Sequence, residues 1–149
     1  MRNRIPLKFI DGRIILTSIV ECPHLRIRRC PIEFVLDTGS TDSLLGASET
    51  TRLQIPVTSL RRKEDIPLGG SVFERPDLPE FVVHVLDEDG PLMTLNQKFS
   101  ALKLSKVSKK KKELASALPS ILGIDFLKNN KLSLHFFPAE EIVYLESEA

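Results

Sequence analysis

The residues that could carry out chemistry gather in a short polar turn behind an apolar run. Residues 34–36 are apolar and lead directly into Asp37-Thr38-Gly39-Ser40-Thr41. The apolar run predicts a strand anchored in the core, which would deliver the carboxylate of Asp37 into a tight turn. Gly39 permits a close or left-handed backbone, and the neighbouring hydroxyls can hydrogen-bond a buried carboxylate. A carboxylate that is buried requires such partners.

The turn also has a plainer interpretation. Asp, Thr, Gly and Ser are common in surface turns that follow strands, and Asp-Thr-Gly arises by chance in roughly a few per cent of chains of this length. A second string far downstream, Pro119–Leu127, strengthens the first interpretation. In it an apolar pair and a glycine, Ile121-Leu122-Gly123, precede a short predicted helix.

Together the two strings resemble the retropepsin family of aspartic proteases. In that family an apolar strand ends in Asp-Thr-Gly-Ser or Asp-Thr-Gly-Ala, and a later hydrophobic-hydrophobic-Gly segment threads beside the catalytic loop. Spacing and chain order agree, and the resemblance covers residues 13–137. It implies an all-β fold, the retropepsin-like closed β-barrel of acid proteases with one short C-terminal helix, as a single domain over residues 1–149.

The resemblance also implies roles for individual residues. Asp37 matches the catalytic aspartate, Thr38 the residue whose hydroxyl locks two catalytic loops together across a dimer, and Gly39 the residue that shapes the turn. Ser40 is expected to donate a hydrogen bond to the outer oxygen of Asp37. The other supporting residues are Ile121, Leu122 and Gly123.

A glycine-bearing hairpin tip is expected at Leu68, Gly69, Gly70 and Ser71. The family places its flap there, a hairpin that closes over bound peptide, although an ordinary turn explains these glycines equally well. Residues 73–79 contain two prolines and do not predict a long second flap strand. Retroviral members carry an arginine after the glycine of the second string, whereas this chain has Ile124.

One Asp-Thr-Gly in the chain implies a homodimer. Hydrolysis in this class needs two carboxylates that share a proton, and Asp125 is expected to cap a helix instead. Two-fold symmetry would bring two copies of Asp37 together. The resemblance therefore implies an endopeptidase that cuts extended peptide with no metal or other cofactor. The alternative is a non-proteolytic retropepsin-fold module that dimerises or binds peptide.

Period-two alternation and turn residues predict the elements that position this turn. Strands are expected at residues 8–10, 13–20, 31–36, 80–86, 93–104, 131–137 and 142–145, with turns at Asp11-Gly12 and Pro138. The last of these strands could pair within the chain or across a dimer. Only Ser48–Leu53 and Asp125–Asn130 read as helical, with Ser48 and Asp125 as caps.

Composition limits the partners. The chain has 149 residues, 42% of them apolar, and a formal net charge of +1, so no global field favours nucleic acid or an acidic membrane. The run of like charges in the lysine-rich residues 103–113 predicts a solvated loop. The alternative is a contact site for acidic protein or nucleic-acid phosphate, which is less favoured because no aromatic residues are interleaved for base stacking. No apolar stretch reaches membrane-spanning length, and the N-terminus lacks a long apolar signal core, so a soluble, cytoplasmic protein is expected.

Cys22 and Cys30 are expected to be reduced thiols.

Overall fold

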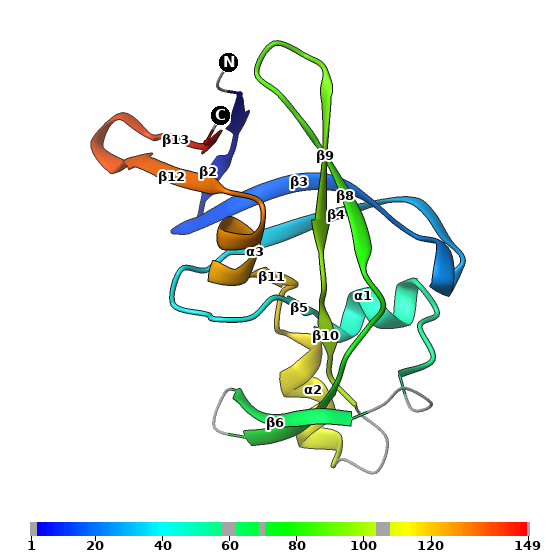
Figure 1. Ribbon diagram of the computed structural model, residues 1–149. Helices are drawn as coiled ribbons and strands as arrows, with labels where there is room; N and C mark the ends of the chain where they lie inside the picture. Colours follow the sequence, from blue (N-terminus) through cyan, green and yellow to red (C-terminus); the bar gives the residue numbers. More distant parts are fainter. Residues whose placement is uncertain (1–2, 58–61, 69–70, 104–107, 149) are drawn as a thin grey trace.

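The computed structural model of the chain describes residues 3–57, 62–68, 71–103 and 108–148 (Figure 1). Within these residues lie a curled sheet of eight strands, a sheet of three strands and a two-stranded hairpin. The strands are β1 (Arg4–Pro6), β2 (Lys8–Ile10), β3 (Arg13–Cys22), β4 (Ile27–Leu36), β5 (Leu44–Leu45), β6 (Arg62–Leu68), β7 (Ser71–Pro76), β8 (Phe81–Leu86), β9 (Leu92–Gln97), β10 (Ser100–Ala101), β11 (Ile121–Leu122), β12 (Leu132–Phe137) and β13 (Ile142–Ser147). The α-helices are α1 (Ala47–Arg52), α2 (Lys109–Ser116) and α3 (Ile124–Asn129).

The long antiparallel hairpin of β3 and β4 forms the middle of the curled sheet. The strand order is β10-β5-β11-β4-β3-β8-β9, and β2 pairs with β3. Along β3 the side chains of Leu16, Ser18 and Val20 are buried, which is the period-two pattern of a strand with one face on the core. Asp11 and Gly12 between β2 and β3 both have positive φ, 52° and 77°, as the tight turn of a two-residue hairpin requires.

The two ends of the chain form the three-stranded sheet. β13 lies in the centre, antiparallel to β1 on one side and to β12 on the other. Figure 1 shows the two termini close together, with the β12–β13 hairpin extending away from the body of the molecule. The last strand is therefore internal to the subunit, which settles one question that the sequence left open.

Aromatic side chains fill the space inside the curled sheet. The rings of Phe34 and Phe99 stack with centroids 5.3 Å apart, and Phe81 meets Phe99 edge-on at 5.4 Å. All three are fully buried. A second, smaller apolar cluster holds Phe73 of β7 against Ala115 of α2. The first cluster fixes the strand that leads to Asp37, and the second fixes the β6–β7 hairpin.

Two helices lie where the sequence predicts them, but their caps differ. α1 begins at Ala47 with Gly46 as its N-cap, so the expected cap Ser48 lies inside the helix. α3 has Gly123 as its N-cap, and Asp125 lies in its first turn. In both cases a glycine with extended backbone precedes the helix, because the chain passes too close to its neighbours there for a larger residue.

The third helix, α2, was not expected from the sequence. It occupies Lys109–Ser116 and so overlaps residues 109–113 of the segment that predicts a loop. The hydroxyl of Ser108 accepts a hydrogen bond from the backbone N–H of Lys111 and caps the helix. Residues 104–107 of the expected loop lie outside the described residues.

Most predicted strands are present with ends shifted by a few residues. The strand expected over residues 93–104 instead ends at Gln97 and resumes as the two-residue β10. Where no long second flap strand was expected, β7 pairs with β6 over six residues in spite of Pro76. Among the described helices, none is long and apolar enough to cross a membrane. Cys22 and Cys30 are both free thiols.

Candidate active site

Asp37 follows β4 at the point where a distant strand joins it. β11 runs parallel to β4, with Leu122 beside Leu36, and antiparallel to β5. The N–H of Val35 donates to the carbonyl of Ser120 (2.9 Å), and the N–H of Asp37 donates to the carbonyl of Leu122 (2.9 Å). The pair Ile121-Leu122 is thus threaded between the strands on either side of the Asp37 turn, as expected.

Gly123 lets the threaded segment pass directly beneath the turn. A Cβ atom at this position would lie 2.7 Å from the carbonyl oxygens of both Ser40 and Asp42. Beyond it, the N–H of Ile124 donates to the carbonyl of Ser40 (2.8 Å), and the N–H of Asp125 donates to that of Thr41 (3.2 Å). The start of α3 therefore holds the Asp37 turn from below through backbone contacts.

Ser43 and Asp125 connect the turn to this helix. The hydroxyl of Ser43 donates to Asp125 Oδ1 (2.7 Å) and accepts from the N–H of Gly123 (3.0 Å). The other oxygen, Asp125 Oδ2, accepts from the N–H of Ser43 (3.1 Å) and from the side-chain amide of Gln97 (2.7 Å). Sequence reasoning missed Ser43 and Gln97, because their role depends on contacts between residues far apart in the chain.

The carboxylate of Asp37 remains accessible. One of its oxygens, Oδ1, accepts a hydrogen bond from the N–H of Gly39 (2.9 Å), and Asp37, Thr38 and Gly39 are all exposed. A Cβ on residue 39 would lie 3.2 Å from that oxygen, so glycine suits the close turn. The geometry presents an oriented acidic group at the surface of the subunit.

Ser40 does not occupy the role expected of it. Its hydroxyl donates to the backbone carbonyl of Asp42 (2.7 Å), not to the carboxylate of Asp37. A serine hydroxyl readily bonds to a carbonyl in its own turn, and this local bond competes with more distant acceptors. Ser40 therefore shapes the turn and does not contact the carboxylate in this structure.

The hairpin of β6 and β7 lies beside the same turn. Leu68 and Ser71 are paired across the hairpin at its tip, while Gly69 and Gly70 lie outside the described residues. Arg75 of β7 is 5% exposed, and its guanidinium lies 3.0 Å from Asp42 Oδ2. This ion pair links the hairpin to the Asp37 turn, and Figure 1 shows the hairpin next to α2 at the bottom of the view.

Comparison with known proteins identifies the fold. Neither a scan against models of protein families nor a search of curated protein sequences finds a match. Among solved structures, the chain is similar to a retropepsin-like aspartic protease from Rickettsia conorii, with 17% identity and a TM-score of 0.61, over 99% of this chain and 91% of that one. A second match is the EIAV protease with a bound inhibitor, at 16% identity and a TM-score of 0.49, over 85% of this chain and 96% of that one.

The chain therefore has the retropepsin-like fold of aspartic proteases. The expected fold class is confirmed: the protein is mostly β, and its main sheet curls into a half-barrel. The expected short C-terminal helix is present as α3, α1 lies at the other predicted helix, and α2 is the helix that the sequence did not predict. The three Asp-Thr-Gly residues and the threaded Ile121-Leu122-Gly123 segment lie together at one site of this fold.

Proposed function

We propose that the protein is one subunit of a homodimeric aspartic endopeptidase. The observation that carries this proposal is the environment of the Asp37 carboxylate. It is exposed, the N–H of Gly39 orients it, and backbone hydrogen bonds from the Ile121-Leu122-Gly123 segment hold its turn in place. Two such carboxylates, one from each subunit, would share a proton across a two-fold axis. No second chain is needed to hold Asp37 in place, but one is needed to supply its partner.

The chemistry follows from two coupled carboxylates. The ionised one takes a proton from a water molecule, and the protonated one donates a hydrogen bond to the scissile carbonyl as water attacks. The pair titrates as a unit with two apparent pKa values, because like charges held close together cannot both ionise easily. An extended peptide would lie between the two subunits, beneath the β6–β7 hairpin of each.

Asp125 is not a candidate for the second carboxylate within one chain. Its oxygens accept hydrogen bonds from Ser43, Gln97 and Phe126, so both are occupied in holding α3 against the turn. This arrangement makes Asp125 a structural residue. The proposed site is therefore complete only when two chains meet.

The experiment compares the parent with two variants that make the same chemical change. Asp37→Asn keeps the shape of the side chain and removes its charge, and we expect cleavage of a diverse peptide library between pH 4 and pH 7 to fall at least about a thousandfold. Asp11→Asn is the control, because Asp11 lies in an exposed turn with φ of 52°, which asparagine adopts readily. Cleavage that survives in the first variant would overturn the assignment of Asp37, and a parent that binds peptides without cutting them would favour a peptide-binding or dimerisation module.

A further inference from the structure

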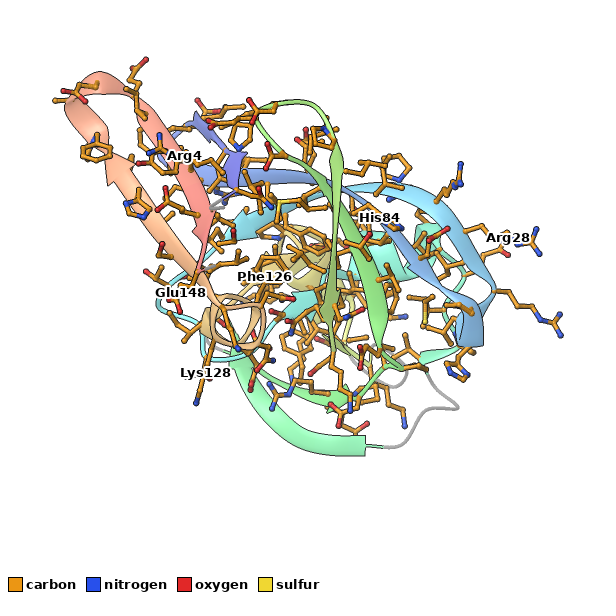
Figure 2. The ribbon with its side chains drawn as sticks, turned by 45° about the horizontal axis from the view of Figure 1, so that its top comes forward. Arg4, Arg28, His84, Phe126, Lys128 and Glu148 are labelled. Atoms are coloured by element: carbon orange, nitrogen blue, oxygen red, sulfur yellow. The ribbon has the colours of Figure 1, made fainter. Side chains whose placement is uncertain are left out.

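A basic hollow lies at the end of the β3–β4 hairpin that is remote from Asp37. The chain turns there through a 3-10 helix at Pro23–Leu25, and three arginines follow within four residues: Arg26, Arg28 and Arg29. Arg26 and Arg29 both have positive φ, 57° and 40°, so the backbone bends at each of them. Figure 2 shows Arg28 pointing away from the body of the molecule at this turn.

The three arginines rim a cavity of about 770 Å³. Its apolar wall comes from Pro23, Ile27 and Val82, and Glu21 is the one acidic residue among the described residues that line it. The volume lies within the range of sites that bind small ligands or short segments of chain. An apolar wall with a charged rim fits a ligand that has both an aliphatic and an anionic part.

The positive charge at this hollow is only partly compensated. Glu21 already lies beside two basic side chains, the imidazole of His84 at 2.8 Å and the guanidinium of Arg29 at 3.9 Å. Within the described residues, Arg26 and Arg28 have no carboxylate within 4.0 Å. The net charge of the whole chain is only +1, so this concentration of charge is local.

The chemistry of arginine indicates what would bind. A guanidinium presents a planar fork of donors that matches a carboxylate in bidentate geometry, and it loses less hydration than an ammonium group does. Among the described residues, no aromatic side chain lines the hollow, so a nucleic acid would find no surface there on which to stack its bases. The charge and the aliphatic wall together favour carboxylate side chains on a peptide.

We propose that the arginine hollow, formed by Arg26, Arg28 and Arg29 around Ile27 and Val82, binds an acidic segment of a protein. The ten residues of β4 separate it from Asp37, a distance of about 30 Å at about 3.3 Å per residue. A segment held here does not occupy the Asp37 site. The hollow is thus a second point of attachment, and its existence does not depend on the proposed catalytic function.

The test measures binding of a fluorescein-labelled hexaglutamate peptide by fluorescence anisotropy, with the Asp37→Asn protein so that cleavage cannot interfere. The triple variant Arg26→Gln, Arg28→Gln and Arg29→Gln is compared with Lys109→Gln, Lys110→Gln and Lys112→Gln on α2. Both sets of side chains are exposed, and both variants lose the same charge. We expect the dissociation constant to rise at least about tenfold in the arginine variant and less than about twofold in the lysine variant.

Equal weakening in the two variants would overturn the proposal, because it would show a response to net charge alone. An absence of saturable binding would also overturn it, as would an oligothymidylate of equal charge that competes better than the peptide. If the arginine variant unfolds, NMR chemical-shift changes in the Asp37→Asn protein locate the binding site instead. On addition of hexaglutamate, the proposal requires the largest chemical-shift changes at residues 21–29 and Val82. Changes concentrated on α2 would refute the assignment.

Discussion

Asp37 and Asp125 are the same amino acid with opposite surroundings, and this difference separates their roles. Asp125 accepts hydrogen bonds at both oxygens from Ser43, Gln97 and Phe126. Asp37 accepts one, from Gly39, and stays exposed. A carboxylate whose lone pairs are all occupied stabilises structure, whereas one held by a single donor can still exchange a proton.

Ser40 and Ser43 provide a matched pair of tests for this division. In Ser40→Ala the lost hydrogen bond is the one to the carbonyl of Asp42, so we expect the acidic limb of the pH–rate profile to stay where it is in the parent. In Ser43→Ala the hydroxyl's bonds with Asp125 Oδ1 and with the N–H of Gly123 are lost, and the free energy of unfolding should fall by about 1–3 kcal/mol. An upward shift of the acidic limb in Ser40→Ala would show that its hydroxyl reaches the carboxylate of Asp37 after all.

Gly123→Ala tests the closeness of the threaded segment. The added Cβ would lie 2.7 Å from two carbonyl oxygens, and backbone atoms cannot rotate away as a flexible side chain does. We expect a loss of at least about 1–3 kcal/mol in the free energy of unfolding, measured in urea, together with reduced activity as the Asp37 turn shifts. A variant with the stability of the parent would mean that the turn and α3 are less tightly packed than the structure describes.

The two cysteines should differ in reactivity. Cys22 is fully buried, and burial raises the pKa of its thiol. Alkylation of Cys22 should be slow because the reagent has little access to the sulfur and because less of the thiol is thiolate at neutral pH. Cys30 is only half-buried. Iodoacetamide should label Cys30 first, as mass spectrometry of peptides would show, and Cys30→Ser should leave only slow labelling. Faster labelling of Cys22 would contradict its burial.

At the scale of elements, the sequence predicts what local pattern determines and fails where a contact between distant segments decides. The β2–β3 hairpin follows from alternation and from Asp11-Gly12, both local signals. β11 is two residues long, and only its place between β4 and β5 makes it a strand. The turn at Asp37 was likewise readable from the sequence, but the partners of Ser43 and Ser40 were not, since a hydroxyl bonds to whichever acceptor the fold brings near.

The helix α2 shows how a strong compositional signal misleads. A run of lysines predicts a solvated loop, yet Lys, Glu, Leu and Ala all favour helix, and Ser108 caps it. Ala115 and Phe73 belong to the same smaller cluster, and the ammonium group of Lys111 lies 5.8 Å from the centre of the Phe73 ring. One face of the helix joins an apolar cluster with Leu44 of β5, Ala47 of α1 and Phe73 of β7, which charge counting does not consider.

Ala115→Asp should release this helix. A carboxylate forced into the apolar cluster is costly, so α2 would detach, and trypsin would cut after Lys109–Lys112 much faster than in the parent. Ala117→Asp makes the same change at an exposed position of the same segment. We expect trypsin to cut this variant at nearly the parent rate. Timed digestion with mass spectrometry compares the three proteins. Rapid cutting at these lysines in the parent would restore the loop interpretation.

At the scale of the whole molecule, the terminal sheet limits how two chains can meet. β13 has a strand of its own chain on each side, so its hydrogen-bonding edges are already filled. In the proposed homodimer, the contact between subunits would come from exposed side chains or from other edges. Ile124 is such a side chain, because it follows Gly123 directly, is 39% exposed, and its N–H binds the carbonyl of Ser40 in the Asp37 turn.

In the proposed homodimer, a two-fold axis that joins two copies of Asp37 would pass near both copies of Ile124, because the N–H of Ile124 binds the carbonyl of Ser40 in the same turn. Ile124→Glu would then bring like charges together at the interface and should weaken dimerisation at least about tenfold. Ile19→Glu is the control, because Ile19 is also 39% exposed but lies on β3, paired with Pro31 and His84 in the middle of the curled sheet.

Sedimentation velocity and activity per subunit, both followed over a dilution series, measure the effect. We expect activity per subunit to fall on dilution in every protein, and to fall at a higher concentration in Ile124→Glu alone. Equal dimerisation of the two variants would place the axis away from Ile124, and a monomer that cleaves with activity independent of dilution would refute the shared site itself.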